Sequence, residues 1–458
     1  MLRTNAACEA AGIPSASIVC EGFISQANAT SVGLGFPGIA LAMVPGHTGI
    51  QGPEEVRRNI LEVTLDRVVA CLTGDGELGE IAAEPDAQDI VCSGTSREIN
   101  QFFLERSWGD GLPITPPTRE RVDEFLRFTP RSPQESLGVL LPDNRLATVW
   151  NVAVNGVMAG CRPEYMPVLL ALAEAMADPG YGVEHSGNTP GAETLIILNG
   201  PVTRLLDFNF TQGVMRDGFQ PNTSVGRFWR LYLRNVAGFL PHKTDKATYG
   251  NTWRVVVPEN EEALSKLGWK SIAMEMGFAR DDSTVTVARY TGGDVVASLS
   301  GSTPEEILSY LADAVFRHIS WQLTFTVGSG PGSLRPLILL TPILAETIAR
   351  AGWSKYDIKK YLFDTARIPA HEFEHHMQEW NSRPVWNLLE EARQGNIPAL
   401  FAESDDPNRR VPLVWEPEHY MIAITGDPLR TNAYVFAHNG YLGFPTTRKI
   451  DVSTLSGR

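Results

Sequence analysis

The chain has 458 residues, of which 43% are hydrophobic, and its formal net charge at pH 7 is −14. This length and apolar content indicate a globular protein with two or three domains and exclude a disordered chain. The acidic charge argues against a nucleic-acid-binding protein, because contact with phosphates requires a basic surface.

The cysteines and the apolar segments indicate the compartment. Five cysteines are widely spaced and no C-x-x-C pair occurs, so neither a disulfide framework nor a cysteine zinc site is favoured. The N-terminal residues MLRTNAACEAAG lack the apolar core of a secretory signal. The most apolar stretch, LRPLILLTPILAETIA, is interrupted by prolines and threonines before it reaches membrane-spanning length. We therefore expect a reduced, cytoplasmic protein that does not contact a membrane.

Residues 1–75 predict a small parallel α/β domain. Helices are expected over 3–11, about 23–33 and from Pro53 onward, and strands over 15–20 and 39–44. Alternation of helices and strands is typical of a parallel sheet. Here the alternation opens on a helix, whereas parallel units normally open on a strand whose C-terminal end carries the active loop. We therefore expect a domain that lacks its first strand.

Residues 76–95 are acidic and rich in small residues, which is typical of a linker, and residues 96–458 predict one large mixed α+β domain. Its expected helices cover about 148–160, 164–177, 222–237, 304–319 and 354–366. Its expected strands cover about 193–198, 253–258, 284–290, 336–341 and 419–425. A capping box from Thr303 to Glu306 marks one helix start. The predicted fold class is thus α/β, with an incomplete parallel domain followed by a larger mixed one.

Residues 371–376 read HEFEHH and match H-E-x-x-H, in which two histidines one helical turn apart bind zinc. His371 and His375 would be ligands, and Glu372 would be the base. A third ligand is needed, but the later His419 and His438 do not fit the metzincin spacing. The polar surroundings favour a solvated surface helix, so a zinc hydrolase is kept only as an alternative.

A polar cluster surrounds the break between two predicted helices in NGVMAGCRPEYMP. Asn155, Arg162 and Glu164 are candidate substrate-binding residues, and Cys161 is the best thiol in the chain. The helix N-terminus that Pro163 opens can hold an anion, with Arg162 as a bidentate clamp. The alternative is a well-capped helix corner with an Arg–Glu pair.

Two further segments carry candidate site residues. FQPNTSVGRFWRLYLRN places Asn222 near a helix start, followed at helical spacing by Arg227, Arg230 and Arg234. Arginines grouped in an acidic protein indicate recognition of carboxylate or phosphate, and a salt-bridged helix is the alternative. Glu259 follows a predicted strand directly, where a catalytic base is often placed, although a solvated turn would also explain it.

No cofactor is identified by a motif. GSGPG at 328–332 lacks the lysine and the spacing of a P-loop, and neither a G-x-S-x-G elbow nor a Rossmann fingerprint is present. With zinc also disfavoured, the cofactor stays unknown.

The segment from CEAAGIPSASIVC to GPEEVRR resembles the substrate subunits of glycine and proline reductases and the UGSC (seleno)protein family. The resemblance spans roughly residues 5–72 and is carried by Glu9, Gly12, Ile13, Pro14, Phe23, the loop Pro45-Gly46-His47 and the helix that follows. The later stretches WGDGLPITPPT and GFQPNTSVGRFWRLYLRNVAGFLP are similar to the large domain fused to UGSC-type domains in some bacterial proteins.

The resemblance implies cysteine- or selenocysteine-based chemistry, reductive or eliminative. In those families the reactive residue lies in a glycine-rich loop after the first strand, near a helix N-terminus that lowers its pKa. This sequence has no such loop. Three explanations are open: the gene model is truncated, the thiol chemistry has been lost, or a second polypeptide supplies the loop. We expect a second polypeptide, because the sheet would otherwise expose an unpaired edge. Cys8 or Cys20 could substitute, although a buried, inert cysteine is the commoner outcome.

Together these features predict an enzyme, or its large subunit, acting on a small, anionic metabolite where the N-terminal sheet meets the large domain. The candidate catalytic residues are His47, Cys161 and Glu259, and the main substrate anchors are Arg162 and Arg227. The expected partners are the small-molecule substrate and a small subunit carrying the missing loop, within an oligomer. The alternative is a non-catalytic scaffold or binding subunit of a heteromeric enzyme.

Overall fold

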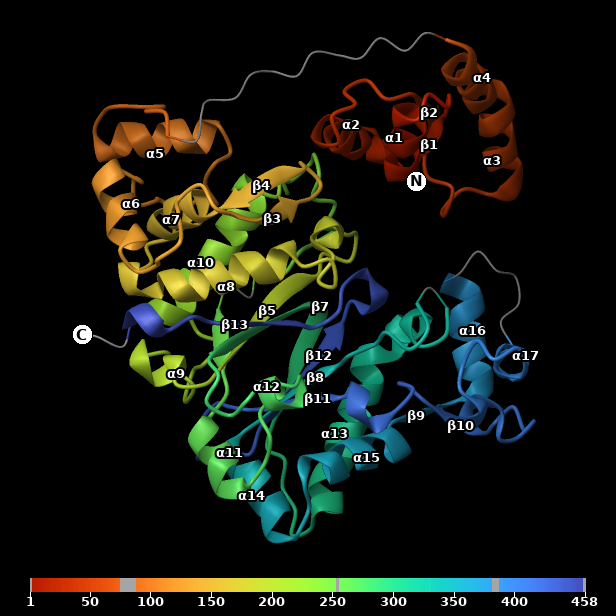
Figure 1. The fold of residues 1–458 in the computed structure, drawn as a ribbon. Coiled ribbons are helices and arrows are strands. Elements are labelled where there is room, and N and C mark those ends of the chain that lie inside the picture. The colour runs from red at the N-terminus through yellow and green to blue at the C-terminus, as the bar shows by residue number, and fades with distance from the viewer. Residues whose placement is uncertain (1, 75–87, 253–254, 329, 381–386, 456–458) are drawn as a thin grey trace.

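The computed structural model describes residues 2–74, 88–252, 255–328, 330–380 and 387–455. Residues 76–87 of the predicted linker lie outside the described residues. Figure 1 shows a small N-terminal domain beside a larger body built around one sheet. None of the described helices is long and apolar enough to span a bilayer.

The N-terminal domain alternates helices and strands as its sequence predicts. Its elements are α1 (Leu2–Ala10), β1 (Ser17–Cys20), α2 (Ile24–Gly33), β2 (Leu41–Val44), α3 (Pro53–Asn59) and α4 (Leu65–Thr73), with a π-helical turn (Ile60–Thr64) joining α3 to α4. β1 and β2 pair in parallel, with Ser17 beside Leu41 and Cys20 beside Val44. The parallel α/β character expected of this region is confirmed.

The large domain mixes helices with antiparallel and parallel strands. Its helices are α5 (Ser96–Glu105), α6 (Arg119–Leu126), α7 (Val149–Met158), α8 (Met166–Ala177), α9 (Val202–Leu205), α10 (Gln220–Asn235), α11 (Glu261–Leu267), α12 (Ile272–Glu275), α13 (Pro304–Ile319), α14 (Pro342–Arg350), α15 (Lys355–Thr365), α16 (Ala370–Trp380) and α17 (Leu388–Arg393). Its strands are β3 (Ser136–Leu140), β4 (Arg145–Thr148), β5 (Glu193–Asn199), β6 (Val256–Pro258), β7 (Thr284–Val296), β8 (Leu337–Leu340), β9 (Arg367–Pro369), β10 (Arg410–Pro412), β11 (Met421–Ile424), β12 (Ala433–His438) and β13 (Thr446–Lys449).

The central sheet has the strand order β11-β8-β12-β7-β5-β6, and β13 also pairs with β7. β8 pairs with β11 in parallel and so does β5 with β6, while β12 and β7 pair with their neighbours antiparallel. Helices α7, α8 and α10 cover one part of the outer face, and α13 to α15 cover another (Figure 1). A separate apolar cluster, which includes Ile197, Tyr290 and Phe436, fills the inner face.

The sheet curls until its two outermost strands meet at one end. The Asn260 backbone N–H donates to the Ile424 carbonyl at 2.7 Å, and the Thr425 hydroxyl donates to the Pro258 carbonyl at 2.8 Å. These contacts join the end of β6 to the end of β11. The two segments that follow β6 and β11 therefore lie together at one edge of the curled sheet.

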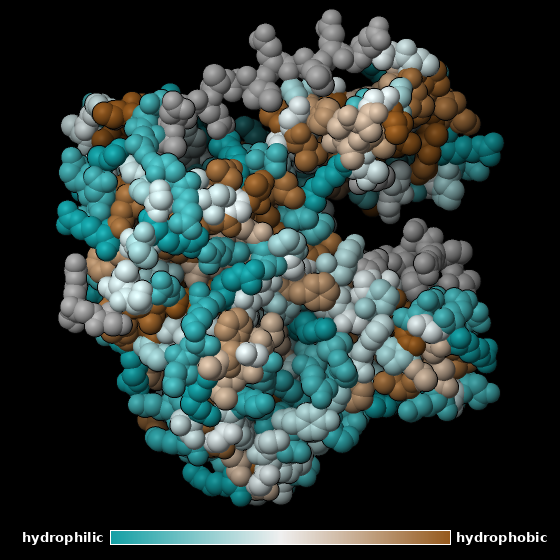
Figure 2. All heavy atoms as spheres, in the orientation of Figure 1, coloured by the Kyte–Doolittle hydropathy of each residue, from teal (hydrophilic) through white to brown (hydrophobic). Residues whose placement is uncertain are grey.

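The N-terminal domain rests on loops of the large domain through polar contacts. The Arg3 guanidinium pairs with Glu184 at 2.8 Å, and the Lys246 ammonium donates to the Gly22 carbonyl at 2.6 Å. Elsewhere the domain exposes an apolar stripe over α4 and the turn before it, formed by Leu61, Leu65, Val69 and Leu72 (Figure 2).

Candidate functional site

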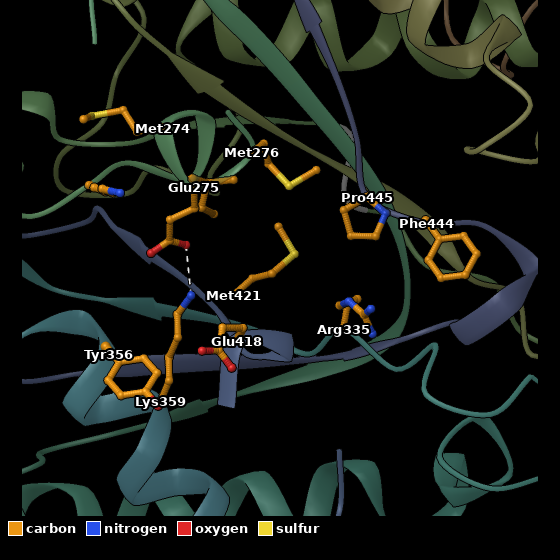
Figure 3. A pocket seen from close by; sticks show the side chains of 12 residues that line it. Met274, Glu275, Met276, Arg335, Tyr356, Lys359, Glu418, Met421, Phe444 and Pro445 are labelled. Atoms are coloured by element: carbon orange, nitrogen blue, oxygen red, sulfur yellow. Dashed lines mark hydrogen bonds and ion pairs between the residues drawn. The ribbon is translucent and has the colours of Figure 1, made fainter. Parts of the chain in front are cut away.

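A cavity of about 560 Å³ lies where α12 meets the starts of β8 and β11 and the helix α15; we call it the α12 cavity. Its charged lining consists of Lys270, Glu275, Arg335, Lys359 and Glu418. Its apolar wall includes Met274, Met276, Met421, Phe444 and Pro445. In Figure 3 the Arg335 side chain lies beside Phe444 and Pro445, while Lys359 reaches toward Glu275 from the opposite side of the pocket.

The short helix α12 is held over the cavity by fixed contacts at its N-terminus. Gly268 ends α11 with φ +67°, a left-handed conformation that glycine adopts without steric cost and that turns the chain toward α12. Ser271 then caps α12, because its hydroxyl accepts the Met274 N–H at 3.3 Å. The Ile272 N–H donates to the Glu259 carboxylate at 2.7 Å. The position of Glu275 at the other end of α12 is thereby set.

Glu275 joins α12 to α15 through two lysines. Its carboxylate lies 3.3 Å from the Lys355 ammonium and 3.0 Å from that of Lys359. The lysines lie one turn apart on α15, and their side chains are only 5% and 8% exposed. Burial and the neighbouring Lys355 charge hold the pKa of Lys359 below its ordinary value, although Glu275 opposes this shift. One carboxylate is thus shared by two buried amines.

Arg335 supplies a second cationic group to the cavity. Its guanidinium donates to the carbonyls of Gly332 and Leu334 at 2.7 and 2.9 Å. No ion pair between Arg335 and an acidic residue is present in the described part of the chain. Burial lowers the pKa of Arg335, but an arginine stays charged in a protein. Its charge is therefore available to an anion, and the methionine and phenylalanine side chains beside it suit an apolar body.

Glu259 is buried behind α12 and does not line the cavity. Its carboxylate accepts from the Asn199 amide at 2.8 Å, from Ile272 N–H at 2.7 Å and from Ile424 N–H at 3.2 Å. Burial outweighs these three donors and raises the pKa of Glu259 to about 7. The residue therefore both closes the curled sheet and positions α12.

The predicted residues around Cys161 form a helix–helix corner away from the α12 cavity. The Arg162 Nε donates to the Tyr165 hydroxyl at 2.8 Å, and the Asn155 amide donates to a backbone carbonyl of its own helix at 2.8 Å. Glu164 lies in the 3₁₀ turn Pro163–Tyr165 beside them. Burial raises the pKa of the Cys161 thiol to about 12, which is unfavourable for a nucleophile. These contacts form a helix corner, but in them Arg162 binds Tyr165 rather than the glutamate of the predicted Arg–Glu pair.

The predicted arginines on α10 are occupied by acidic neighbours. Arg227 makes a bidentate pair with Asp110 at 2.9 and 2.8 Å, and Arg230 pairs with Glu193 at 3.1 Å. Asn222 is fully buried and its amide donates to the Val256 carbonyl at 2.8 Å. Asp110, Glu193 and Arg230 line a separate polar cavity of about 170 Å³. This polar cavity is separate from the α12 cavity, and Glu259 does not line it.

His47 lies at the C-terminal edge of the β1–β2 sheet. It is exposed, its ring lies 5.9 Å from that of Phe23, and its Nδ1 accepts the Gly49 N–H at 3.0 Å. Cys20 ends β1 at the same edge, with its sulfur 3.8 Å from the Thr48 hydroxyl. Because the adjacent Gly22 carbonyl is bound by Lys246, this edge adjoins the large domain.

The HEFEHH segment forms the exposed helix α16. Phe373 and Met377 point into the core, while His371 and His375 are exposed. The Nδ1 of His371 lies 3.0 Å from the Pro407 carbonyl. Across the described ranges, no group of three or more His, Cys, Asp or Glu side chains could hold a metal ion. The arrangement is that of the solvated surface helix.

Sequence reasoning did not select Arg335, Glu275, Lys355 or Lys359. The two lysines follow Ser354 in a helix whose charged residues resemble an ordinary solvated face, and Glu275 ends a four-residue helix with no periodic signal. The one available signal was the run MEM, an acidic residue between two methionines.

Comparison with known proteins adds one finding. Residues 1–74 match the model of the UGSC family, and the match ends with α4. Neither the curated proteins nor the solved structures contain a match to the chain. The expected UGSC-type character is thereby supported for the N-terminal domain, whereas the similarity to glycine and proline reductases and to a fused large domain stays a prediction.

Proposed function

We propose that this chain is an enzyme, or the large subunit of one, that acts on a small anionic metabolite with an apolar part bound in the α12 cavity. The observation that carries the proposal is the Arg335 guanidinium, which lines the cavity and makes no ion pair in the described part of the chain, although the Glu416 charge lies within electrostatic range. A half-buried cation without a direct ion pair attracts a counter-charge, and an anionic ligand would supply it.

The charge balance of the lining supports an anion. Lys270 and Arg335 line the cavity, and the buried Lys355 and Lys359 share the single carboxylate of Glu275. Even with Lys359 neutral, the other three cations outnumber the carboxylates of Glu275 and Glu418. An excess of positive charge in a concave site concentrates anions, even though the whole chain carries a net charge of −14. The volume of about 560 Å³ suits a small metabolite.

The binding test uses 8-anilinonaphthalene sulfonate, a fluorescent anion with an apolar body, displaced by hexanoate. We expect Arg335→Gln to weaken the displaceable component at least about tenfold, since it removes a charge-assisted contact. The control Arg350→Gln changes an exposed arginine paired only within its own helix. Equal affinities in the wild type and Arg335→Gln, with unchanged circular dichroism, would refute the proposal.

A second candidate function, thiol chemistry at the edge of the β1–β2 sheet, is supported by a separate observation. Cys20 and His47 share the C-terminal edge of that sheet, within the segment that matches the UGSC family. In this proposal a partner chain contributes a reactive cysteine or selenocysteine, together with a strand that pairs with an open edge of the sheet. The chain would then be part of a hetero-oligomer.

Native mass spectrometry of the protein expressed with its neighbouring genes tests this second candidate. A small chain carrying a cysteine or selenocysteine loop, bound in equal ratio, is the expected result. If instead a homo-oligomer forms and His47→Gln leaves the alkylation rate of Cys20 unchanged, the thiol proposal fails.

A further inference from the structure

Two lysine amines line the α12 cavity, Lys270 and Lys359, and of these Lys270 is exposed whereas Lys359 is buried. We propose that the Lys359 amine forms an imine with the carbonyl carbon of an oxo acid whose carboxylate is held by Arg335. This inference rests on the proposed function, because the same cavity must first bind the acid.

The shared carboxylate makes one of the two lysines the better nucleophile. Glu275 balances one ammonium charge, yet both Lys355 and Lys359 lie within 3.3 Å of it and both are nearly buried. Two ammonium groups on one carboxylate leave an excess buried charge, which is relieved when one amine is neutral.

The Lys355 ammonium has more partners around it than the Lys359 amine. Its ammonium also donates to the Lys270 carbonyl at 2.8 Å, and the buried Glu259 carboxylate lies within electrostatic range of it. Among the described residues Lys359 donates a hydrogen bond to Glu275 alone, with the Glu418 charge farther away, and it lines the cavity. Lysines activated by burial and by a neighbouring cation are the ones that form Schiff bases. Lys359 therefore fits the role of the neutral amine.

The reaction needs no oxidant or reductant. The lone pair of the neutral Lys359 nitrogen attacks the carbonyl carbon, a C–N bond forms, and the oxygen takes up a proton to give a carbinolamine. Loss of the oxygen as water, with both nitrogen protons removed, gives a neutral imine, so amine plus ketone becomes imine plus water. Glu275, whose carboxylate lies 3.0 Å from the Lys359 nitrogen, is placed to carry the proton at that atom.

The cavity also orients the acid. Arg335 lies across the pocket from Lys359, so a carboxylate on the guanidinium directs the rest of the molecule toward the amine (Figure 3). The methionine side chains between them, including Met421, accept an apolar chain without a fixed shape. The substrate class that fits is a small oxo acid with an aliphatic or aromatic tail.

Reductive trapping of the full-length protein tests the inference. The protein is incubated with 5-oxohexanoate, whose carbonyl is separated from its carboxylate by three methylene groups, and sodium cyanoborohydride, and is then mapped by peptide mass spectrometry. We expect one main adduct, on Lys359, heavier by the mass of the acid less one oxygen atom. Labelling of Lys359 should exceed that of Lys360, an exposed neighbour paired with Asp364, by at least about tenfold, as expected for an amine activated by its site.

The controls separate the possible failures. Lys359→Arg should abolish the main adduct, and Lys360→Arg should not. Hexanoate, which lacks the carbonyl, should suppress labelling of the wild type. This competition control does not depend on the folding of a variant. Equal labelling of Lys359 and Lys360 overturns the inference. If the Arg335-dependent binding of the fluorescent anion persists in that case, the proposed function stands, and if it is absent as well, both fall.

Discussion

The carboxyl group of Glu259 makes the stability of the protein depend on pH. Its pKa is raised from the ordinary 4.5 to about 7, so the folded state binds more protons than the unfolded state between these values. Stability therefore falls as the pH rises through this window and is constant above it. The shift corresponds to at most about 3 kcal/mol.

Glu259→Gln removes this titration. We expect the free energy of unfolding of the wild type, relative to the variant, to decrease between about pH 4.5 and about pH 7. Urea unfolding across that range measures it. A difference between the two proteins that does not change with pH would mean that Glu259 is ionised throughout, held by its three hydrogen-bond donors.

Cys161 offers a second test at a single side chain. Because burial raises the pKa of its thiol to about 12, almost none is thiolate at neutral pH. Alkylation by iodoacetamide should be about a thousandfold slower in the folded protein than in urea, in proportion to the thiolate fraction. Mass spectrometry of the labelled peptide measures the alkylation rate, and Cys20, at the edge of the β1–β2 sheet, serves as the internal comparison. Fast labelling of Cys161 would restore it as a candidate nucleophile.

From the sequence alone, a candidate site residue can be predicted where its neighbours along the chain form a recognisable pattern. Glu259 stands out because it follows a strand, and the structure indeed places it directly after β6. The inward direction of its carboxylate could not be foreseen, because one donor, Ile424, lies 165 residues away. The place of Arg335 in a cavity could not be predicted either, because the side chains that line the cavity with it, such as Met421 and Phe444, come from other segments.

At the scale of elements, the contact between α12 and α15 depends on Glu275. Glu275→Gln removes the one carboxylate that the buried Lys355 and Lys359 both contact, which should destabilise the fold by about 2–4 kcal/mol. Chemical denaturation measures the loss.

The matched control is Glu346→Gln, whose partner Arg350 is exposed on the same helix; it should cost less than about 0.5 kcal/mol. If the two variants lose similar amounts of unfolding free energy, the lysine side chains of the Glu275→Gln variant have moved into solvent. That result would also argue against an activated Lys359.

Local signals predicted many elements well. The capping box from Thr303 to Glu306 marked the start of α13, and the helices predicted over about 304–319 and 354–366 correspond to α13 and α15. The predicted α/β class is confirmed as well. The strand β12 was missed, since its six residues lie between loops without a marked alternation. Strand order was also beyond reach, because β12 pairs with strands that precede it by many residues.

At the scale of the whole molecule, the N-terminal domain is attached by few polar contacts. Arg3–Glu184 and Lys246–Gly22 are partly exposed, and surface pairs of this kind contribute little and are screened by salt. The double variant Arg3→Ala with Lys246→Ala should therefore let the domain separate.

Small-angle scattering measures that separation. At about 0.5 M salt, where screening is strong, we expect a larger radius of gyration for the double variant than for the wild type. The variant Lys360→Ala, which alters a charge elsewhere on the surface, serves as the control. Identical scattering from all three proteins would show that apolar packing, rather than these charges, holds the domain in place.

The place of β12 in the sheet has a consequence for biosynthesis. β12 lies between β7 and β8, yet it comes from residues 433–438, late in the chain. Until the ribosome has released this segment, both neighbouring strands present open hydrogen-bonding edges in a nascent polypeptide. The central sheet can therefore be completed only once residues 433–438 have emerged from the ribosome, whereas β1 and β2 of the small N-terminal domain, within residues 17–44, can pair much earlier.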